Sequence, residues 1–147
     1  MQVAGFESTL KYESKRMLMN LNFSYQSLIG HDNVLFFRSD SYFSDMPKYY
    51  GNLVLGYKVL DKEKHSLWLT GNMRLYGKRY TRDESQPEDP ACGILNLGTN
   101  YTYKGFDFEF FAYNVLNHKY SLGSSKLGLY YQEPFSFLGT IRWNFKF

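Results

Sequence analysis

Hydrophobic and polar residues alternate with a period of two along most of this chain, and no segment of helical length repeats every 3.6 residues. The alternation is clearest over 135–147. One face there is apolar and consists of Phe135, Phe137, Gly139, Ile141, Trp143, Phe145 and Phe147. Opposite it lie the polar residues Ser136, Thr140, Arg142, Asn144 and Lys146, with Leu138 as the one interruption. This segment is predicted to be a strand with one apolar face.

The same alternation predicts six more strands. Their expected ranges are 2–12, 17–27, 49–60, 65–77, 94–104 and 106–117. Strands of soluble proteins have a typical length of about five or six residues, whereas a tilted strand needs roughly 9–11 residues to cross a bilayer. Seven long strands in succession therefore predict an all-β fold, an antiparallel transmembrane β-barrel segment.

The predicted connections differ at the two ends of the strands. Short charged turns are expected at 13–16, 61–64 and 104–105. Long polar loops are expected at roughly 28–47, 78–93 and 118–133, where Gly, Pro, Ser and Asp gather. Outer-membrane barrels have this asymmetry, with their short turns in the periplasm. The C-terminus is therefore expected on the periplasmic side and residue 1 near the extracellular rim.

Composition agrees with a barrel wall. Aromatic residues make up 20% of the 147 residues, with 14 Tyr and 13 Phe, as expected where aromatic girdles sit at both membrane interfaces. No run of about 18 apolar residues predicts a membrane-spanning helix. The net charge of +3 is dispersed, so no nucleic-acid partner is expected. Cys92 is the only cysteine, which excludes an internal disulfide and a thiolate metal site.

Nothing in the pattern supports catalysis, and we expect no cofactor and no metal site. His31, His65 and His118 are not at metal-ligand spacing, and their ordinary role is that of solvated loop or interface residues. Ligand contacts are expected from aromatic and polar side chains of the extracellular loops, because Tyr and Arg are frequent anchors of binding surfaces. The candidates are His31, Tyr42, Tyr80, Arg82, His118, Tyr130 and Tyr131.

The closing strand resembles the C-terminal assembly signal of bacterial outer-membrane proteins, which has a terminal Phe preceded by alternating apolar residues. The matching residues are Ile141, Trp143, Phe145 and Phe147. The resemblance implies recognition by the barrel-assembly machinery. Aromatic residues at this rim also suit the headgroup level of the surrounding outer-membrane lipid.

Four further segments are similar to TonB-dependent outer-membrane receptors. The pattern Asn-x-Leu-Asn-x-x-Tyr over Asn114–Tyr120 is followed, after a loop, by Pro134 before the final strand. The family's usual Pro-Gly-Arg is replaced here by Pro134-Phe135-Ser136. Upstream, Asp45-Met46-Pro47-Lys48-Tyr49-Tyr50 resembles a Pro-led strand entry, and Gly5-Phe6-Glu7 resembles the opening of an earlier strand.

This resemblance implies a 22-stranded barrel closed by an N-terminal plug. Such a receptor imports ferric siderophores, haem, cobalamin or a similar scarce nutrient, and it is energised by the inner-membrane TonB complex. A barrel of that size needs roughly 460 residues at about 21 per strand. The chain has no recognisable secretory signal, plug or TonB box. We therefore expect residues 1–147 to be the C-terminal third of such a barrel, without its plug, and not an enzyme.

Two other interpretations follow from the same strands. A small complete barrel of eight strands, acting as an adhesin or structural anchor, requires an extra strand near Val34-Leu35-Phe36-Phe37. A soluble β-sandwich binding module is the third interpretation. The outward-facing sets of Phe and Leu argue against it, because a long apolar edge left in water promotes aggregation.

Overall fold

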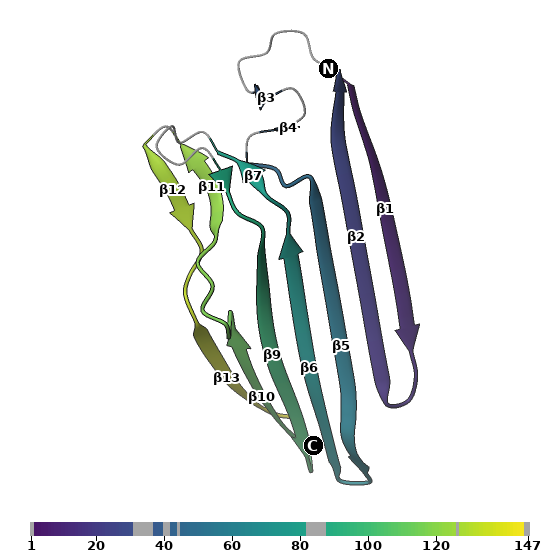
Figure 1. Ribbon diagram of the computed structural model, residues 1–147. Coiled ribbons are helices and arrows are strands. Elements are labelled where there is room, and N and C mark those ends of the chain that lie inside the picture. Colours follow the sequence, from purple (N-terminus) through teal and green to yellow (C-terminus); the bar gives the residue numbers. More distant parts are fainter. Residues whose placement is uncertain are drawn as a thin grey trace.

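The computed structural model describes residues 2–30, 37–39, 42–43, 45–81, 88–125 and 127–145. Seven long antiparallel strands form one sheet in which consecutive long strands lie side by side (Figure 1). They are β1 (Gln2–Glu13), β2 (Met17–Gly30), β5 (Tyr49–Lys62), β6 (His65–Tyr76), β9 (Cys92–Tyr103), β10 (Phe106–Tyr113) and β13 (Ser136–Trp143). The all-β fold of seven long strands is confirmed.

Each long connection carries a small hairpin, which the alternation pattern did not predict. These hairpins are β3 (Phe37–Ser39) with β4 (Tyr42–Phe43), β7 (Arg79–Tyr80) with β8 (Glu88–Asp89), and β11 (Ser121–Ser125) with β12 (Gly128–Tyr131). They gather at the end of the sheet that also holds the N-terminus, which we call the loop end (Figure 1). The short turns and the C-terminus lie at the opposite end, which we call the turn end.

The turn between β9 and β10 contains only two residues. Lys104 has φ 46° and Gly105 has φ 88°, the positive values that a type I′ hairpin turn requires at both positions. A Cβ on Gly105 would lie 2.8 Å from the backbone oxygen of Asn144. The tight turn places Phe106 opposite Tyr103, and so sets which residues of the two strands share a face.

The observed strand boundaries differ most from the expected ones at the ends of β10 and β13. β10 ends at Tyr113 and not at residue 117, because Asn114 and Asn117 adopt positive φ values of 48° and 49°. The Asn114 side chain accepts a hydrogen bond from His118 N and donates one to His118 O, both 2.9 Å long. These bonds replace the strand pairing with a closed turn. β13 ends at Trp143, and residues 146–147 lie outside the described part of the chain.

On β2 and β10 the apolar side chains are more exposed than the polar ones, whereas both faces of the edge strand β1 are exposed. On β10, Phe106, Phe108 and Phe110 are exposed, whereas the alternating Asp107 and Glu109 are half-buried. We call the face of the three Phe residues the apolar face and the other one the polar face. On β13, the apolar face shows Phe137, Ile141 and Trp143 with exposures of 68%, 71% and 60%. Water-soluble proteins normally shelter such residues.

Buried apolar packing is confined to the loop end. Among the described residues, Cys92, Ile94 and Tyr120 form the buried cluster, with Tyr76 packed against it. This cluster lies where the segment after β10 folds back over β6 and β9. No helix in the described ranges is long and apolar enough to cross a membrane.

Candidate ligand site at the loop end

A hydrogen-bonded line of asparagines crosses the polar face. Asn72 Nδ2 donates to Asn52 Oδ1 (2.7 Å), and Asn96 Nδ2 donates to Asn72 Oδ1 (3.2 Å). The line continues because the backbone N of Asn114 donates to Asn96 Oδ1 (2.8 Å). Three neighbouring strands, β5, β6 and β9, are thereby tied to the turn that follows β10. The same bonds orient the amide groups across the polar face.

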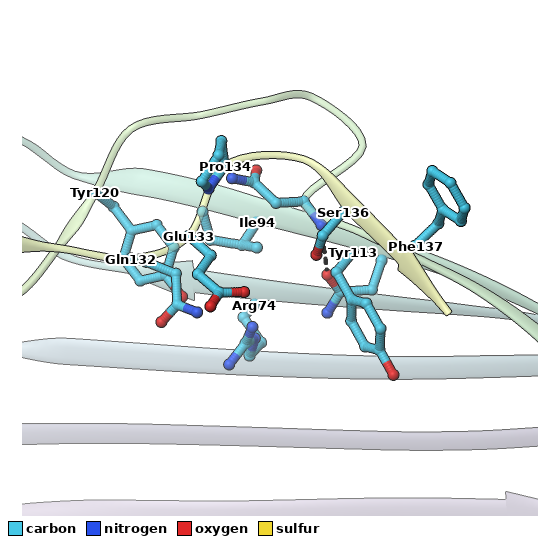
Figure 2. Close-up of a pocket in the computed structure, with 11 residues that line it drawn as sticks. Arg74, Ile94, Tyr113, Tyr120, Gln132, Glu133, Pro134, Ser136 and Phe137 are labelled. Carbon is cyan, nitrogen blue, oxygen red and sulfur yellow. Dashed lines mark hydrogen bonds between the residues drawn. The ribbon is translucent and has the colours of Figure 1, made fainter. Parts of the chain in front are cut away.

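A cavity of about 410 Å³ lies beside this line, at the loop end of the polar face. Arg74 comes from β6, Tyr120 from the segment before β11, and Gln132 and Glu133 from the segment after β12. Figure 2 shows Gln132 and Glu133 extending toward the guanidinium of Arg74. The cavity therefore combines a cation, a carboxylate and neutral hydrogen-bonding groups from elements far apart in the sequence.

Arg74 and Tyr120 are the two groups of this cavity with the clearest chemical potential. Arg74 Nε is buried and has no hydrogen-bond partner among the described residues. Burial raises the pKa of the Tyr120 phenol above its ordinary value, although the neighbouring Arg74 guanidinium lowers it in part. The phenol therefore keeps its proton at neutral pH and remains a hydrogen-bond donor. A guanidinium and a phenol OH can together bind the oxygens of an anionic group, although the Glu133 carboxylate lines the same cavity.

Tyrosine rings extend the site along the polar face. The rings of Tyr76 and Tyr120 are stacked with centroids 5.7 Å apart, and those of Tyr50 and Tyr76 are tilted with centroids 5.2 Å apart. Such rings offer flat apolar surface with polar hydroxyl tips. An aromatic ligand group could therefore pack beside the Arg74 cation.

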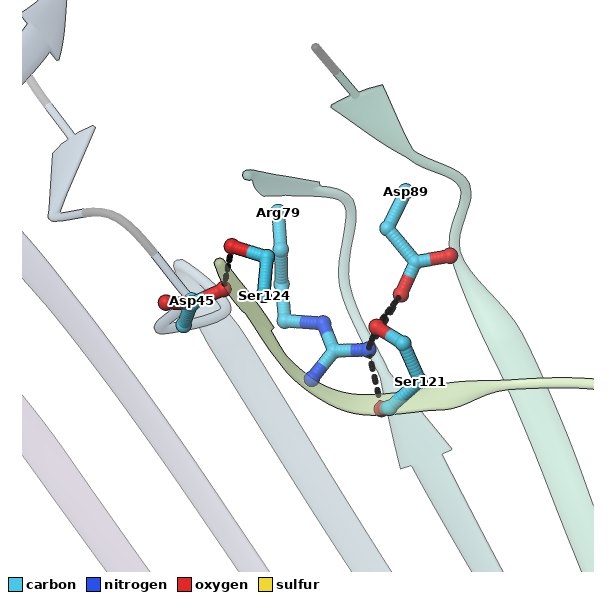
Figure 3. Close-up of polar contacts among 5 residues, drawn as sticks. All are labelled: Asp45, Arg79, Asp89, Ser121 and Ser124. Atoms are coloured by element: carbon cyan, nitrogen blue, oxygen red, sulfur yellow. Dashed lines mark hydrogen bonds and ion pairs between the residues drawn. The ribbon is translucent and has the colours of Figure 1, made fainter. Parts of the chain in front are cut away.

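A buried polar cluster ties the loops together (Figure 3). Arg79 and Asp89 are each 6% exposed and form an ion pair through Arg79 Nη2 and Asp89 Oδ2. The same Nη2 donates to the backbone oxygen of Ser121 (2.6 Å) and to its Oγ (3.0 Å). Ser121 Oγ in turn donates to Asp89 Oδ2 (2.7 Å). The hairpin β7–β8 is thus joined to β11.

A second link brings in the segment before β5. Ser124 Oγ on β11 donates to Asp45 Oδ1, and Asp45 N donates to the backbone oxygen of Tyr80 (2.7 Å). Asp45 has φ 67°, a conformation that Asp tolerates better than most residues. The three long connections therefore meet in one hydrogen-bonded unit.

Those ligand residues predicted from sequence that the structure describes lie at the loop end, but none of them lines the cavity. Tyr80 lies on β7 with Lys78 Nζ 5.5 Å from its ring. Tyr130 and Tyr131 are exposed on β12, and His118 is exposed in the turn after β10. The backbone of Tyr42 lies in β4. His31 and Arg82 lie outside the described residues, and the role of the whole set stays a prediction.

The sequence-based candidates were chosen because they lie in predicted loops, and that criterion did not find the residues that line the cavity. Arg74 belongs to a strand, and nothing in a single sequence places it beside Tyr120, which lies 46 positions later. Tyr120 is the last residue of the Asn-x-Leu-Asn-x-x-Tyr pattern, and this pattern is the sequence signal that could have pointed to it. Arg79 and Ser121 are 42 positions apart, and their contact likewise leaves no local pattern.

The residues expected to form the assembly signal lie at the turn end of the apolar face. Ile141, Trp143 and Phe145 are exposed, and the ring of Trp143 stacks on that of Phe106 with centroids 5.5 Å apart. Phe147 lies outside the described residues. Recognition of this segment by the assembly machinery stays a prediction. In the described ranges, no three His, Cys, Asp or Glu residues are grouped to hold a metal ion.

No protein-family model matches the chain, and no curated protein matches it in sequence. Solved structures match its fold, and two of them do so over 95% of its length. The siderophore receptor PiuA from Acinetobacter baumannii has a TM-score of 0.74 and 18% identity. The ferric-catecholate import receptor Fiu from K12 E. coli, in a closed form, has a TM-score of 0.76 and 19% identity.

The chain spans about a fifth of each of these receptors, 21% of PiuA and 20% of Fiu. Both are TonB-dependent receptors. The matched region includes nearly the whole of this chain, and the strand order described above is that of a continuous antiparallel barrel wall. The fold of this chain is that of part of the β-barrel of a TonB-dependent receptor.

Proposed function

We propose that this chain forms part of the wall of an outer-membrane receptor that imports a ferric siderophore, haem or a similar scarce nutrient. The receptor is energised through TonB and carries out no catalysis. The observation that carries the membrane-wall part of this proposal is the exposure pattern of β2 and β10, where the apolar side chains are exposed and the polar ones that alternate with them are half-buried. The similar structures are named as a siderophore receptor and a ferric-catecholate import receptor.

The apolar face fits a lipid environment. Monomeric soluble proteins rarely expose contiguous apolar patches larger than about 300–600 Å², and this face continues across all seven long strands. Leu10 on β1, Phe23 on β2, Leu69 on β6 and Ile141 on β13 are all exposed. Contact with lipid hydrocarbon removes these apolar side chains from water. Hydrogen bonds between paired strands satisfy their backbone polar groups there.

The polar face fits the inside of such a wall. Its amide line and the Arg74 cavity lie on the side away from the apolar face, and the cavity is at the loop end. Outer-membrane barrels carry their long loops on the extracellular side. An anionic iron chelate that arrives from outside would therefore meet the loops and then Arg74. TonB would act through a plug segment that is not among these residues.

The open sheet favours a portion of a larger barrel over a small complete one. β1 and β13 are the two edges of the sheet and do not pair with each other. The additional strand that an eight-stranded barrel requires was expected at residues 34–37. Of these, residues 34–36 lie outside the described part, and Phe37 pairs with β4 in a separate hairpin.

Uptake of a radiolabelled ferric catecholate chelate tests the proposal. Iron-starved cells that express the receptor whose barrel includes this wall should accumulate the label when TonB is active and should fail to do so when TonB is deleted. Expression of a variant with the Arg74→Ala change should reduce accumulation, whereas Arg142→Ala, at an exposed position away from the cavity, should leave it unchanged. Uptake that persists without TonB would contradict the energised-import account.

A further inference from the structure

A row of aromatic rings crosses the turn end of the apolar face. The centroids of neighbouring rings are 4.6 Å apart for His65 and Tyr103, 6.2 Å for Tyr101 and Phe108, and 5.5 Å for Phe106 and Trp143. Tyr101 lies 6.5 Å from Tyr103, and Phe106 lies 6.2 Å from Phe108, so the row is continuous from β6 to β13. Aromatic rings with polar tips settle at the headgroup level of a bilayer.

Polar groups gather at the β6–β9 end of this row. His65 Nδ1 lies 2.7 Å from the Tyr101 hydroxyl, and Lys104 Nζ lies 5.2 Å from the Tyr103 ring centroid. Lys104 N donates to the backbone oxygen of Lys64 (3.4 Å), which places the two turns side by side. Both lysines are exposed. The Lys104 ammonium thus lies beside the Tyr103 ring at the edge of the aromatic row. The exposed Lys64 belongs to the neighbouring turn.

Charge at the turn end is predominantly positive. Its cationic side chains are Lys15, Arg16, Lys62, Lys64 and Lys104. The carboxylates in the same turns are Glu13, Asp61 and Glu63. Asp61 is already paired with Lys58 at 3.3 Å, so the cations outnumber the carboxylates that remain to balance them. This favours an anionic occupant over a zwitterionic one, whose own cation would approach the lysines.

We propose that Lys64, Lys104, His65 and Tyr103 form a binding site for the phosphate of an anionic phospholipid headgroup, in the leaflet that the short turns reach. This inference rests on the proposed membrane location of the apolar face. The acyl chains would lie along the exposed aromatic and aliphatic side chains of β9 and β10, while the lysines contact the phosphate. Each basic residue near an anionic lipid surface contributes attraction that salt weakens.

Lipid selectivity measured with spin-labelled lipids tests the site. The receptor whose barrel includes this wall is refolded into phosphatidylcholine vesicles that contain a trace of spin-labelled phosphatidylglycerol or spin-labelled phosphatidylcholine. At low ionic strength the relative association constant should favour phosphatidylglycerol by roughly fivefold. Lys64→Gln with Lys104→Gln should bring the ratio close to one. Lys64→Arg with Lys104→Arg should retain the preference, because the charges remain.

A matched pair of changes at the other end serves as the control. Lys48→Gln with Lys119→Gln removes the same charge from the loop end and should leave the preference intact. An unchanged preference in the Lys64 and Lys104 double variant would overturn the site, as would the absence of any preference in the unaltered protein. Loss of the preference on adding inorganic phosphate at constant ionic strength would assign the site to free phosphate instead. Failure of every variant to insert into vesicles would contradict the membrane proposal itself.

Discussion

Arg79 donates a hydrogen bond of 2.6 Å to the backbone oxygen of Ser121, and so joins two hairpins that are 42 positions apart in the chain. The guanidinium is buried and also forms an ion pair with Asp89. Breaking a buried pair is costly because it leaves one charge without its partner. The contact therefore determines how the β7–β8 hairpin sits against β11 and, through Ser124 and Asp45, against the segment before β5.

Replacing Arg79 with Ala should loosen the loop end. The Asp89 carboxylate would stay buried without its cation, which costs about 3–5 kcal/mol. Limited proteolysis of the refolded protein should show faster cleavage within residues 78–91, while the long strands stay intact. Arg142→Ala removes an exposed arginine 3.7 Å from Glu109 and should leave the cleavage rate unchanged. Equal protection in Arg79→Ala and the unaltered protein would contradict the role given to this ion pair.

Gly98 and Gly139 provide a matched test of packing on the sheet. A Cβ on Gly98 would lie 2.5 Å from Phe111 Cε1 and 2.6 Å from Thr70 Oγ1, whereas nothing lies within 4 Å of one on Gly139. Gly98→Ala should therefore reduce the free energy of unfolding by about 1–3 kcal/mol, a usual cost of overpacking. Gly139→Ala should leave it nearly unchanged. Urea unfolding in vesicles measures both, and equal effects would show that Phe111 moves aside without cost.

Asn114 should be important for two separable reasons. Its side chain bonds both backbone polar groups of His118, and its φ of 48° is a conformation that Asn and Gly adopt more readily than Ala. Asn114→Gly loses the side-chain bonds alone, whereas Asn114→Ala also incurs the backbone strain, about 1–2 kcal/mol. The measured free energy of unfolding should be lowest for Asn114→Ala, intermediate for Asn114→Gly and highest for the unaltered protein. The reverse order would contradict the described turn.

Arg74 should determine affinity for an anionic ligand. Removing its charge with Arg74→Gln is expected to weaken binding of a ferric catecholate chelate about 10- to 100-fold, the range for a lost charge-assisted hydrogen bond. Quenching of intrinsic fluorescence during titration with the chelate measures the affinity. Arg142→Gln, at an exposed position outside the cavity, should bind normally. A neutral iron chelate should lose far less affinity, and an equal loss for both chelates would argue against an electrostatic role for Arg74.

Alternation was sufficient to predict the seven long strands and their faces, because successive side chains of a strand point to opposite faces. Phe106, Phe108 and Phe110 share the apolar face as expected. The Lys104–Gly105 turn was also predicted, from a short charged break between two alternating segments. The sequence did not predict the end of β10, since that end depends on positive φ at Asn114 and Asn117. It also did not predict the small hairpins, whose strands are two to five residues long.

The candidate site was less predictable than the fold. Loop position suggested residues such as Tyr130 and His118, which prove to be exposed at the loop end but outside the cavity. The cavity instead depends on Arg74 from a strand interior and on Tyr120, brought together by the return of the chain after β10. Contacts of this kind join residues that are distant in sequence, so no local pattern reveals them.

The orientation of β10 relative to lipid is the central claim, and depth-resolved fluorescence quenching tests it most directly. Single cysteines placed at Phe108 and at Glu109, in a protein whose Cys92 is replaced by Ala, would each carry an environment-sensitive dye in vesicles. Quenchers attached to the acyl chains should extinguish the dye at position 108 and leave the dye at 109 largely unaffected, since the two positions alternate between faces. Equal quenching at both positions, or quenching at 109 alone, would contradict the account.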